Sequence, residues 1–120
     1  MAQILVIEDS QTEAMAFAQL LEKIGHNVIH AENGEAGVEK AKATIPDLVI
    51  MDVVMPGLNG FQATRQITRE ASTSHIPVII VTTKDQETDR VWGKRQGAVA
   101  FLTKPVPENI LLDTINQALS

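Results

Sequence analysis

The chain has 120 residues, a net charge of −5 at neutral pH and no cysteine. This length predicts one domain around a single hydrophobic core. The lack of cysteine excludes disulfide bonds, thiol catalysis and thiolate metal sites, and the negative charge argues against a nucleic-acid surface. No apolar run approaches the roughly 18 residues of a membrane-spanning helix, and no signal-peptide pattern opens the chain. We therefore expect a cytoplasmic protein without membrane insertion.

The first part of the chain alternates between a short apolar run and an amphipathic segment. Gln3 to Ile7 predicts a strand, and a helix follows in which Ser10 and Glu13 have the spacing of a capping box. Its apolar side consists of residues at helical spacing, namely Ala14, Phe17, Leu21 and Ile24. A second strand is predicted from Asn27 to Ala31, and a second helix from Gly34 to about Ala43.

The central strand is predicted from Leu48 to Asp52, where four consecutive apolar residues end in a carboxylate. Such a run is typical of a strand that is buried on both faces of a parallel sheet. Ligands of open α/β sheets bind beyond the carboxyl ends of the strands. We therefore expect Asp52 at the functional edge, although an ordinary loop aspartate would produce the same local pattern.

The second half of the chain continues the alternation. It predicts a helix from Gly60 to about Glu70, a strand from Pro77 to Val81, a helix from about Gln86 to Gln96 and a strand from Ala98 to Thr103. A last helix begins near Pro107, a residue that suits the first helical turn. The residues that this helix is expected to bury are Ile110, Leu111, Ile115 and Leu119.

Five strand–helix units in strict alternation predict an α/β fold with right-handed crossovers and helices on both faces of a parallel sheet. A flavodoxin-like, doubly wound, five-stranded sheet with the order 2-1-3-4-5 matches the chain length. No repeat, low-complexity tract or linker interrupts the chain, so we expect residues 1–120 to form a single domain with five helices.

Polar residues follow the predicted strands at their carboxyl ends: Glu8, Asp9, Asp52, Thr82 and Lys104. Three carboxylates in one small site repel each other, so protons or a cation must be bound there. Hard oxygen ligands without histidine or cysteine suit Mg²⁺. A lysine and a hydroxyl beside such a cation supply what a phosphoryl group requires, namely positive charge and hydrogen-bond donors.

Each of these residues also has an ordinary interpretation in isolation. The Glu8–Asp9 pair could be first-turn acids favoured by the helix dipole, Thr82 a strand residue, and Lys104 a solvated surface lysine. Their common register with Asp52 favours a site.

The remaining candidates have no spacing that indicates a site. His26, His30 and His75 lack metal-ligand spacing and are interpreted as structural. Trp92 adjoins Val91 on a predicted helix, and we expect it to pack at the edge of the core rather than to contact a partner.

Taken together, four separated motifs resemble the receiver domain of two-component response regulators, the CheY-like family. They are Glu8-Asp9, Asp52 with Met55-Pro56-Gly57 and Gly60, Thr82, and Lys104-Pro105. A narrower resemblance links this chain to the PilH-type regulators of type IV pilus twitching motility. It is carried by the segments Met51 to Gln66, Ile76 to Ala98 and Leu102 to Val106.

The family resemblance implies that Asp52 is a phosphoacceptor that takes a phosphoryl group from a histidine kinase of chemotaxis-like type. It further implies a Mg²⁺ cofactor held by Glu8, Asp9, Asp52 and the backbone carbonyl of Val54. Such a chain is a signalling protein rather than an enzyme acting on a separate substrate, although it would catalyse its own phosphotransfer and slow self-dephosphorylation.

The same resemblance assigns roles to three residues of the last two strands. Lys104 and Thr82 would contact phosphoryl oxygens, with a cis peptide bond aiming Lys104 at Asp52. Thr82 and Phe101 would form the switch, which changes a partner-binding face in residues 86–119. The target would be another protein and not a nucleic acid, because no DNA-binding motif or effector enzyme follows in the sequence.

Three residues depart from the family pattern: Glu8 stands where Asp is commoner, Phe101 where Tyr is frequent, and Thr83 where a small residue is usual. Alternatives are a degenerate or phosphate-sink receiver that acts by protein binding only, or a regulator of another chemotaxis-like pathway. A flavin carrier would need a phosphate-binding loop where Glu8-Asp9 would repel the phosphate. A phosphatase with an aspartate nucleophile would need a second Asp where the chain has Val54.

Overall fold

The computed structural model describes residues 1–120 and contains five strands that alternate with five helices, as predicted. The strands are β1 (Gln3–Ile7), β2 (Asn27–Ala31), β3 (Leu48–Met51), β4 (Val78–Thr82) and β5 (Ala100–Thr103). The helices are α1 (Gln11–Lys23), α2 (Gly34–Thr44), α3 (Gly60–Arg69), α4 (Glu87–Arg95) and α5 (Glu108–Leu119). None of them combines the length and apolar character that crossing a bilayer requires.

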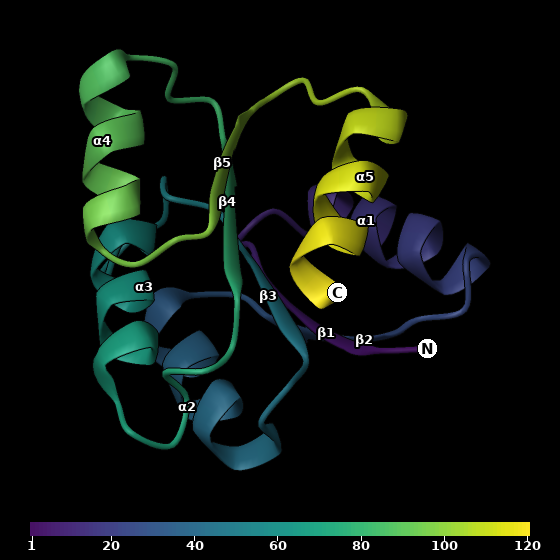
Figure 1. Cartoon of the computed structure of the whole chain (residues 1–120), viewed down its shortest axis with the longest axis horizontal. Coiled ribbons are helices and arrows are strands. Elements are labelled where there is room, and N and C mark those ends of the chain that lie inside the picture. The colour runs from purple at the N-terminus through teal and green to yellow at the C-terminus, as the bar shows by residue number, and fades with distance from the viewer.

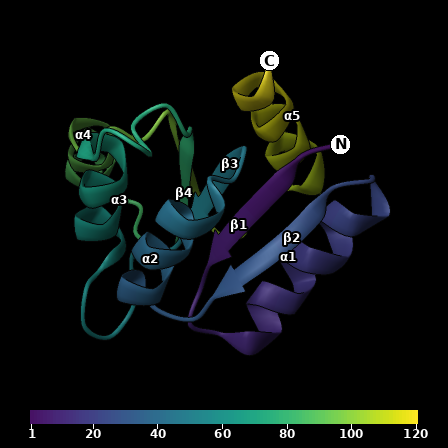
Figure 2. The same ribbon diagram turned by 90° about the horizontal axis from the view of Figure 1, so that it is seen from below.

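The strands form one parallel sheet in the order β2-β1-β3-β4-β5, which confirms the predicted flavodoxin-like topology. Figure 1 shows the sheet edge-on, with α1 and α5 on one face and α2, α3 and α4 on the other. Figure 2 shows the same layers from below. The strand order reverses between β1 and β3, and this is the position at which open α/β sheets form a crevice.

The sheet is buried on both faces at its centre, which explains the unbroken apolar runs of its middle strands. Every residue of β3 and β4 is buried. One apolar cluster under α2, α3 and α4 includes Phe61 and Ile67, and a second under α1 and α5 includes Leu21 and Ile115. The hydrophobic effect therefore fixes which face of each strand meets which helices.

Strand register brings the ends of the strands to one level. Ile7 pairs with Met51, and the Asp52 N–H donates to the Ile7 carbonyl over 3.0 Å. At the other side of the sheet, the Lys104 N–H donates to the Thr82 carbonyl over 2.7 Å. The residues that follow β1, β3 and β5 thus leave the sheet at the same edge.

Three predicted boundaries and faces are wrong. The fifth strand begins at Ala100 rather than Ala98, because the Ala98 N–H still donates to the carbonyl of Gly93 and closes α4. Ile110 was expected in the core but is 44% exposed, since Leu111 beside it takes the inward direction of α5. Ile24 was expected on the apolar side of the first helix but is 43% exposed, because α1 ends one residue earlier, at Lys23.

Gly60 lets α3 start directly against the backbone that carries Asp52. A Cβ at this position would overlap the Asp52 carbonyl oxygen and lie 2.6 Å from the Val53 Cα. The Gly60 N–H also donates to the Val53 carbonyl over 3.0 Å. Only glycine permits this close approach without moving the end of β3.

We therefore expect Gly60→Ala to lower the free energy of unfolding by roughly 1–3 kcal/mol, the usual cost of overpacking. Urea denaturation would measure this change. Gln66→Ala, on the exposed side of the same helix, should change it by no more than about 0.5 kcal/mol. Equal midpoints for the two variants would contradict the steric argument.

Candidate functional site

Three carboxylates gather where β1 and β3 end. One oxygen each from Glu8, Asp9 and Asp52 lies within 4.8 Å of the others. Glu8 is 1% exposed and Asp52 is 8% exposed, whereas Asp9 faces solvent. The structure therefore brings together the three acidic side chains that the sequence singled out.

Asp52 is held by the backbone that follows it. Its Oδ1 accepts hydrogen bonds from the N–H groups of Val53, over 2.7 Å, and Val54, over 3.4 Å. Its Oδ2 lies 3.5 Å from the Lys104 Nζ. One oxygen is thus fixed by amides, while the other faces an ammonium group.

Lys104 enters the site directly after β5 and directly before a cis Lys104–Pro105 peptide bond, which confirms the predicted isomer. Its Nζ lies 3.0 Å from the Glu8 Oε1 and 2.5 Å from the Glu13 Oε1. The Lys104 side chain is only 15% exposed. A single ammonium therefore contacts carboxylates from β1, α1 and the end of β3.

Glu13 is a site residue that the sequence reasoning assigned to a capping box. Its N–H does donate to the Ser10 Oγ, over 3.3 Å, but its carboxylate pairs with Lys104 instead of the helix N-terminus. In α3 the reciprocal box is complete, between Asn59 and Gln62. Glu13 and Lys104 are separated by 91 positions, so no local pattern could indicate the contact.

Glu8 is fixed by two neighbours besides Lys104. The Ser10 N–H donates to its Oε2 over 3.1 Å, and the His30 Nε2 donates to its backbone carbonyl over 2.7 Å. His30 is therefore structural, as predicted, and it ties the end of β1 to β2. The His26 Nδ1 accepts from the Ala2 N–H over 3.0 Å at the opposite end of β1.

Burial is the largest single influence on the ionisation of both Glu8 and Lys104. Desolvation raises the pKa of the Glu8 carboxyl to about 7, although the Ser10 N–H and the Lys104 ammonium favour its charged form. Desolvation also opposes the charged form of Lys104, but its hydrogen bonds to Glu13 and Glu8 outweigh this and raise its pKa above the usual range. Lys104 is thus the stable positive charge of the site.

Thr82 and Phe101 lie beside this cluster rather than in it. Thr82 is fully buried, and its Oγ1 accepts from the Lys84 N–H over 3.4 Å, without a hydrogen bond to Asp52 or Lys104. Phe101 is 5% exposed, and the Arg90 guanidinium lies over its ring, 5.5 Å from the centroid. The sequence reasoning did not identify Arg90.

Arg90 joins α4 to β5. Its Nη1 donates to the Phe101 carbonyl over 3.2 Å, and its Nη2 donates to the Thr103 Oγ1 over 3.3 Å. The helix that follows β4 is therefore attached to the strand that carries Lys104.

The acidic cluster fits a magnesium ion by its donor set. Hard carboxylate oxygens without histidine or cysteine are the ligands that Mg²⁺ takes, and Mg²⁺ usually keeps several waters besides one or two carboxylates. The exposed Asp9 leaves the cluster open to such waters. Two buried carboxylates beside one lysine also leave negative charge that a cation would balance.

Comparison with known proteins gives a consistent result along the whole chain. The response regulator receiver domain model matches residues 4–116. Protein PilH of Pseudomonas aeruginosa is 64% identical over 120 residues, which cover 100% of this chain and 99% of that protein. Response regulator PleD of Caulobacter vibrioides is 34% identical over 92% of this chain, which spans 24% of PleD. The structure of the Vibrio cholerae chemotaxis protein CheY4 superimposes with a TM-score of 0.92 at 28% identity and covers 99% of both chains.

The raised pKa of Glu8 predicts a pH-dependent stability of the metal-free protein. An acid with a pKa near 7 in the folded state and 4.5 when unfolded favours folding below pH 4.5 and loses this contribution as the pH rises through 7. In EDTA, the wild type should therefore gain roughly 1–3 kcal/mol of unfolding free energy between pH 8 and pH 5 relative to Glu8→Gln. Urea titrations at both pH values measure this difference. Parallel pH profiles of the two proteins would contradict the prediction.

Proposed function

Because this chain belongs to the response regulator receiver family, we propose that Asp52 accepts a phosphoryl group from a phosphohistidine of a histidine kinase. The observation that carries the proposal is the state of the Asp52 carboxylate. One oxygen is held by two backbone N–H groups, and the other lies 3.5 Å from the Lys104 ammonium. This arrangement orients a nucleophile and supplies a positive charge beside it.

In the transfer step, the Asp52 Oδ2 attacks phosphorus, the P–N bond to the kinase imidazole breaks, and the imidazole leaves with its electron pair. The product is an aspartyl phosphate. Lys104 then pairs with a phosphoryl oxygen, because an added dianionic group is a stronger partner for an ammonium than one carboxylate oxygen. Positioning and charge neutralisation are the main contributions that a protein makes to phosphoryl transfer.

We further propose that Glu8, Asp9, Asp52 and the Val54 backbone carbonyl hold Mg²⁺ for this reaction. The bound ion would supply positive charge opposite the phosphoryl oxygens. The three carboxylates support the proposal because their oxygens are close enough to share one ion. Val54 is 54% exposed, so the loop that follows β3 lies at the surface here.

Thr82 and Phe101 are proposed to transmit phosphorylation to a protein target. A phosphoryl group on Asp52 would recruit the buried Thr82 hydroxyl, and the loop from Thr82 to α4 would move with it. Arg90 supports this route, because it attaches α4 to the backbone of Phe101. The proposed output face, within residues 86–119, exposes four large apolar side chains: Val91, Trp92, Val99 and Ile110.

We propose that the pathway is the control of type IV pilus twitching motility through a kinase of chemotaxis-like type. The support is the 64% identity with Protein PilH over the whole chain. A regulator of another chemotaxis-like pathway, or a receiver that serves as a phosphate sink, would contain the same site. Phosphorylation assays with candidate kinases, combined with twitching assays of a deletion strain, would separate these alternatives.

Asp52→Asn should fold normally and gain no phosphoryl group, because an amide is no nucleophile for this step. Incubation with acetyl phosphate and Mg²⁺, followed by intact mass and hydroxylamine treatment, measures the modification. Asp113→Asn, an exposed change on α5, should be modified like the wild type. Label on another side chain of the Asp52 variant would refute the assignment, and an unmodified wild type would refute the proposed function.

Trp92 should report the switch, because it is the single tryptophan and lies on α4 with 47% of its surface exposed. Mg²⁺ with beryllofluoride should change its fluorescence more than Mg²⁺ alone. Asp52→Asn should abolish the additional change. Identical wild-type spectra in the two conditions would contradict coupling between the site and α4.

A further inference from the structure

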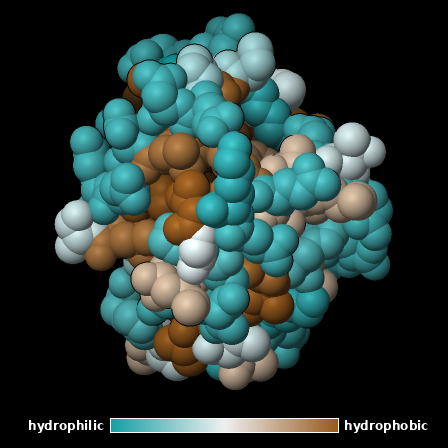
Figure 3. Space-filling view, turned by 90° about the vertical axis from the view of Figure 1, so that its right-hand side faces the viewer, coloured by the Kyte–Doolittle hydropathy of each residue, from teal (hydrophilic) through white to brown (hydrophobic).

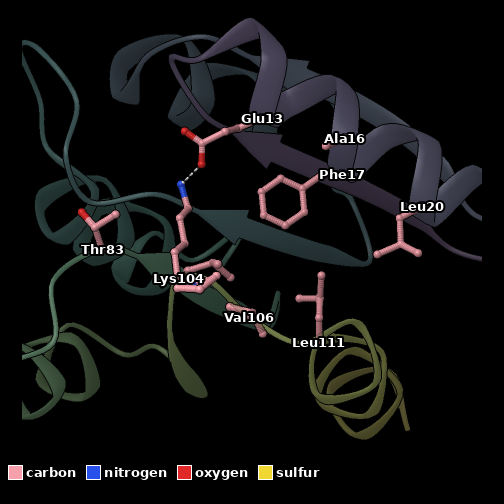
Figure 4. A pocket seen from close by; sticks show the side chains of 10 residues that line it. Glu13, Ala16, Phe17, Leu20, Thr83, Lys104, Val106 and Leu111 are labelled. Carbon is pink, nitrogen blue, oxygen red and sulfur yellow. Dashed lines mark hydrogen bonds and ion pairs between the residues drawn. The ribbon is translucent and has the colours of Figure 1, made fainter.

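We propose that Glu13 is a positioning residue that draws the Lys104 ammonium toward α1, and so away from full contact with Asp52, until the phosphoryl group is transferred. This inference rests on the proposed function and adds a control element to the same site. It starts from an ion pair between α1 and the end of β5, which Figure 4 shows as a contact between the tips of the two side chains.

The geometry places Lys104 closer to Glu13 than to its proposed catalytic partner. An ammonium has three N–H donors, and Glu13, Glu8 and Asp52 are the three acceptors around this one. The distances from Nζ are 2.5 Å to Glu13, 3.0 Å to Glu8 and 3.5 Å to Asp52. Lys104 thus hydrogen-bonds to the two glutamates, whereas the Asp52 Oδ2 is the most distant of the three acceptors.

Of the two glutamates that hydrogen-bond to Lys104, only Glu13 is free to release the ammonium group. The Glu8 side chain is 2% exposed, and its second oxygen accepts from the Ser10 N–H. The Glu13 side chain is 47% exposed and makes no other hydrogen bond through its carboxylate. Glu13 can therefore turn to water when Lys104 moves, since an exposed carboxylate keeps its hydration.

An open groove beside the pair gives Glu13 the space for this movement. The groove has a volume of about 470 Å³ and lies between α1 and the segment from β5 to α5. Its lining includes Phe17, Val106 and Leu111, together with Glu13 and Lys104 themselves. Figure 3 looks onto this side and shows apolar atoms in a hollow that is bordered by hydrophilic ones. The ion pair is therefore next to solvent and not sealed in the core.

Phosphorylation would then proceed through a partner exchange. Lys104 leaves Glu13 and meets the phosphoryl oxygen on Asp52, while Glu8 remains in place. The free energy needed to break the Glu13–Lys104 ion pair therefore adds to the barrier of phosphorylation. Removing the Glu13 charge should lower this barrier without removing any group that touches the phosphoryl group.

The test is the rate of phosphorylation by acetyl phosphate with Mg²⁺, followed by intact mass. Glu13→Gln keeps the size of the side chain and the backbone N–H that Ser10 caps. It should react about 1.5- to fivefold faster than the wild type, the range that a partly exposed ion pair supplies. Glu22→Gln makes the same charge change on the exposed side of α1, without an ion partner, and should react at the wild-type rate.

A second measurement distinguishes release of Lys104 from reduced repulsion of an anionic donor. In the wild type, the side-chain carboxyl carbon signal of Glu13 in NMR spectra should shift when beryllofluoride is added to the Mg²⁺ form, whereas that of Glu22 should not. A faster Glu13→Gln variant with an unmoved Glu13 signal would overturn the inference, as would equal rates for the two variants. A wild type that takes no phosphoryl group at all would instead overturn the proposed function.

Discussion

Two carboxylates are buried at one edge of the sheet, and a single ammonium group faces both of them. Glu8 and Asp52 leave neighbouring strands at the same level, almost without exposure to water. Buried charges are stable only when they are paired or hydrogen-bonded, and Lys104 supplies the pairing from the far end of the chain. The site is therefore also a structural tie, which connects the end of β5 with the ends of β1 and β3.

This tie depends on strand register more than on any single side chain. A shift of one residue in β3 would exchange the side chains that face α1 and α5 with those that face α2, α3 and α4, and would carry Asp52 away from the Glu8 side chain. The buried apolar residues of β3 and β4 prevent such a shift, because both faces of these strands pack against helices. Core packing thus sets the geometry of the polar edge.

The sequence was informative where structure follows from local periodicity. The apolar run before Asp52 predicted both the central strand and the place of its carboxylate, and the alternation of strands and helices predicted the sheet order. Glu13 and Arg90 could not be found in this way, because their partners lie on elements that only the folded chain brings near. Thr82 and Lys104 were found because they follow predicted strands in common register with Asp52, although each in isolation would pass for a strand residue or a surface lysine. The family resemblance added their roles toward a phosphoryl group.

Very little of α4 is buried against the sheet, and this affects the dynamics of the molecule. Only Gly93 of this helix is buried, where its missing side chain admits the ring of Phe101. Opening such a helix exposes little additional apolar surface to water. Its local unfolding therefore requires much less free energy than global unfolding. Amide hydrogens of α4 should accordingly exchange with solvent deuterium well before those of β3 and β4. The helix that follows Thr82, a proposed switch residue, has the fewest buried residues of the five helices, and we expect thermal fluctuations to open it most readily.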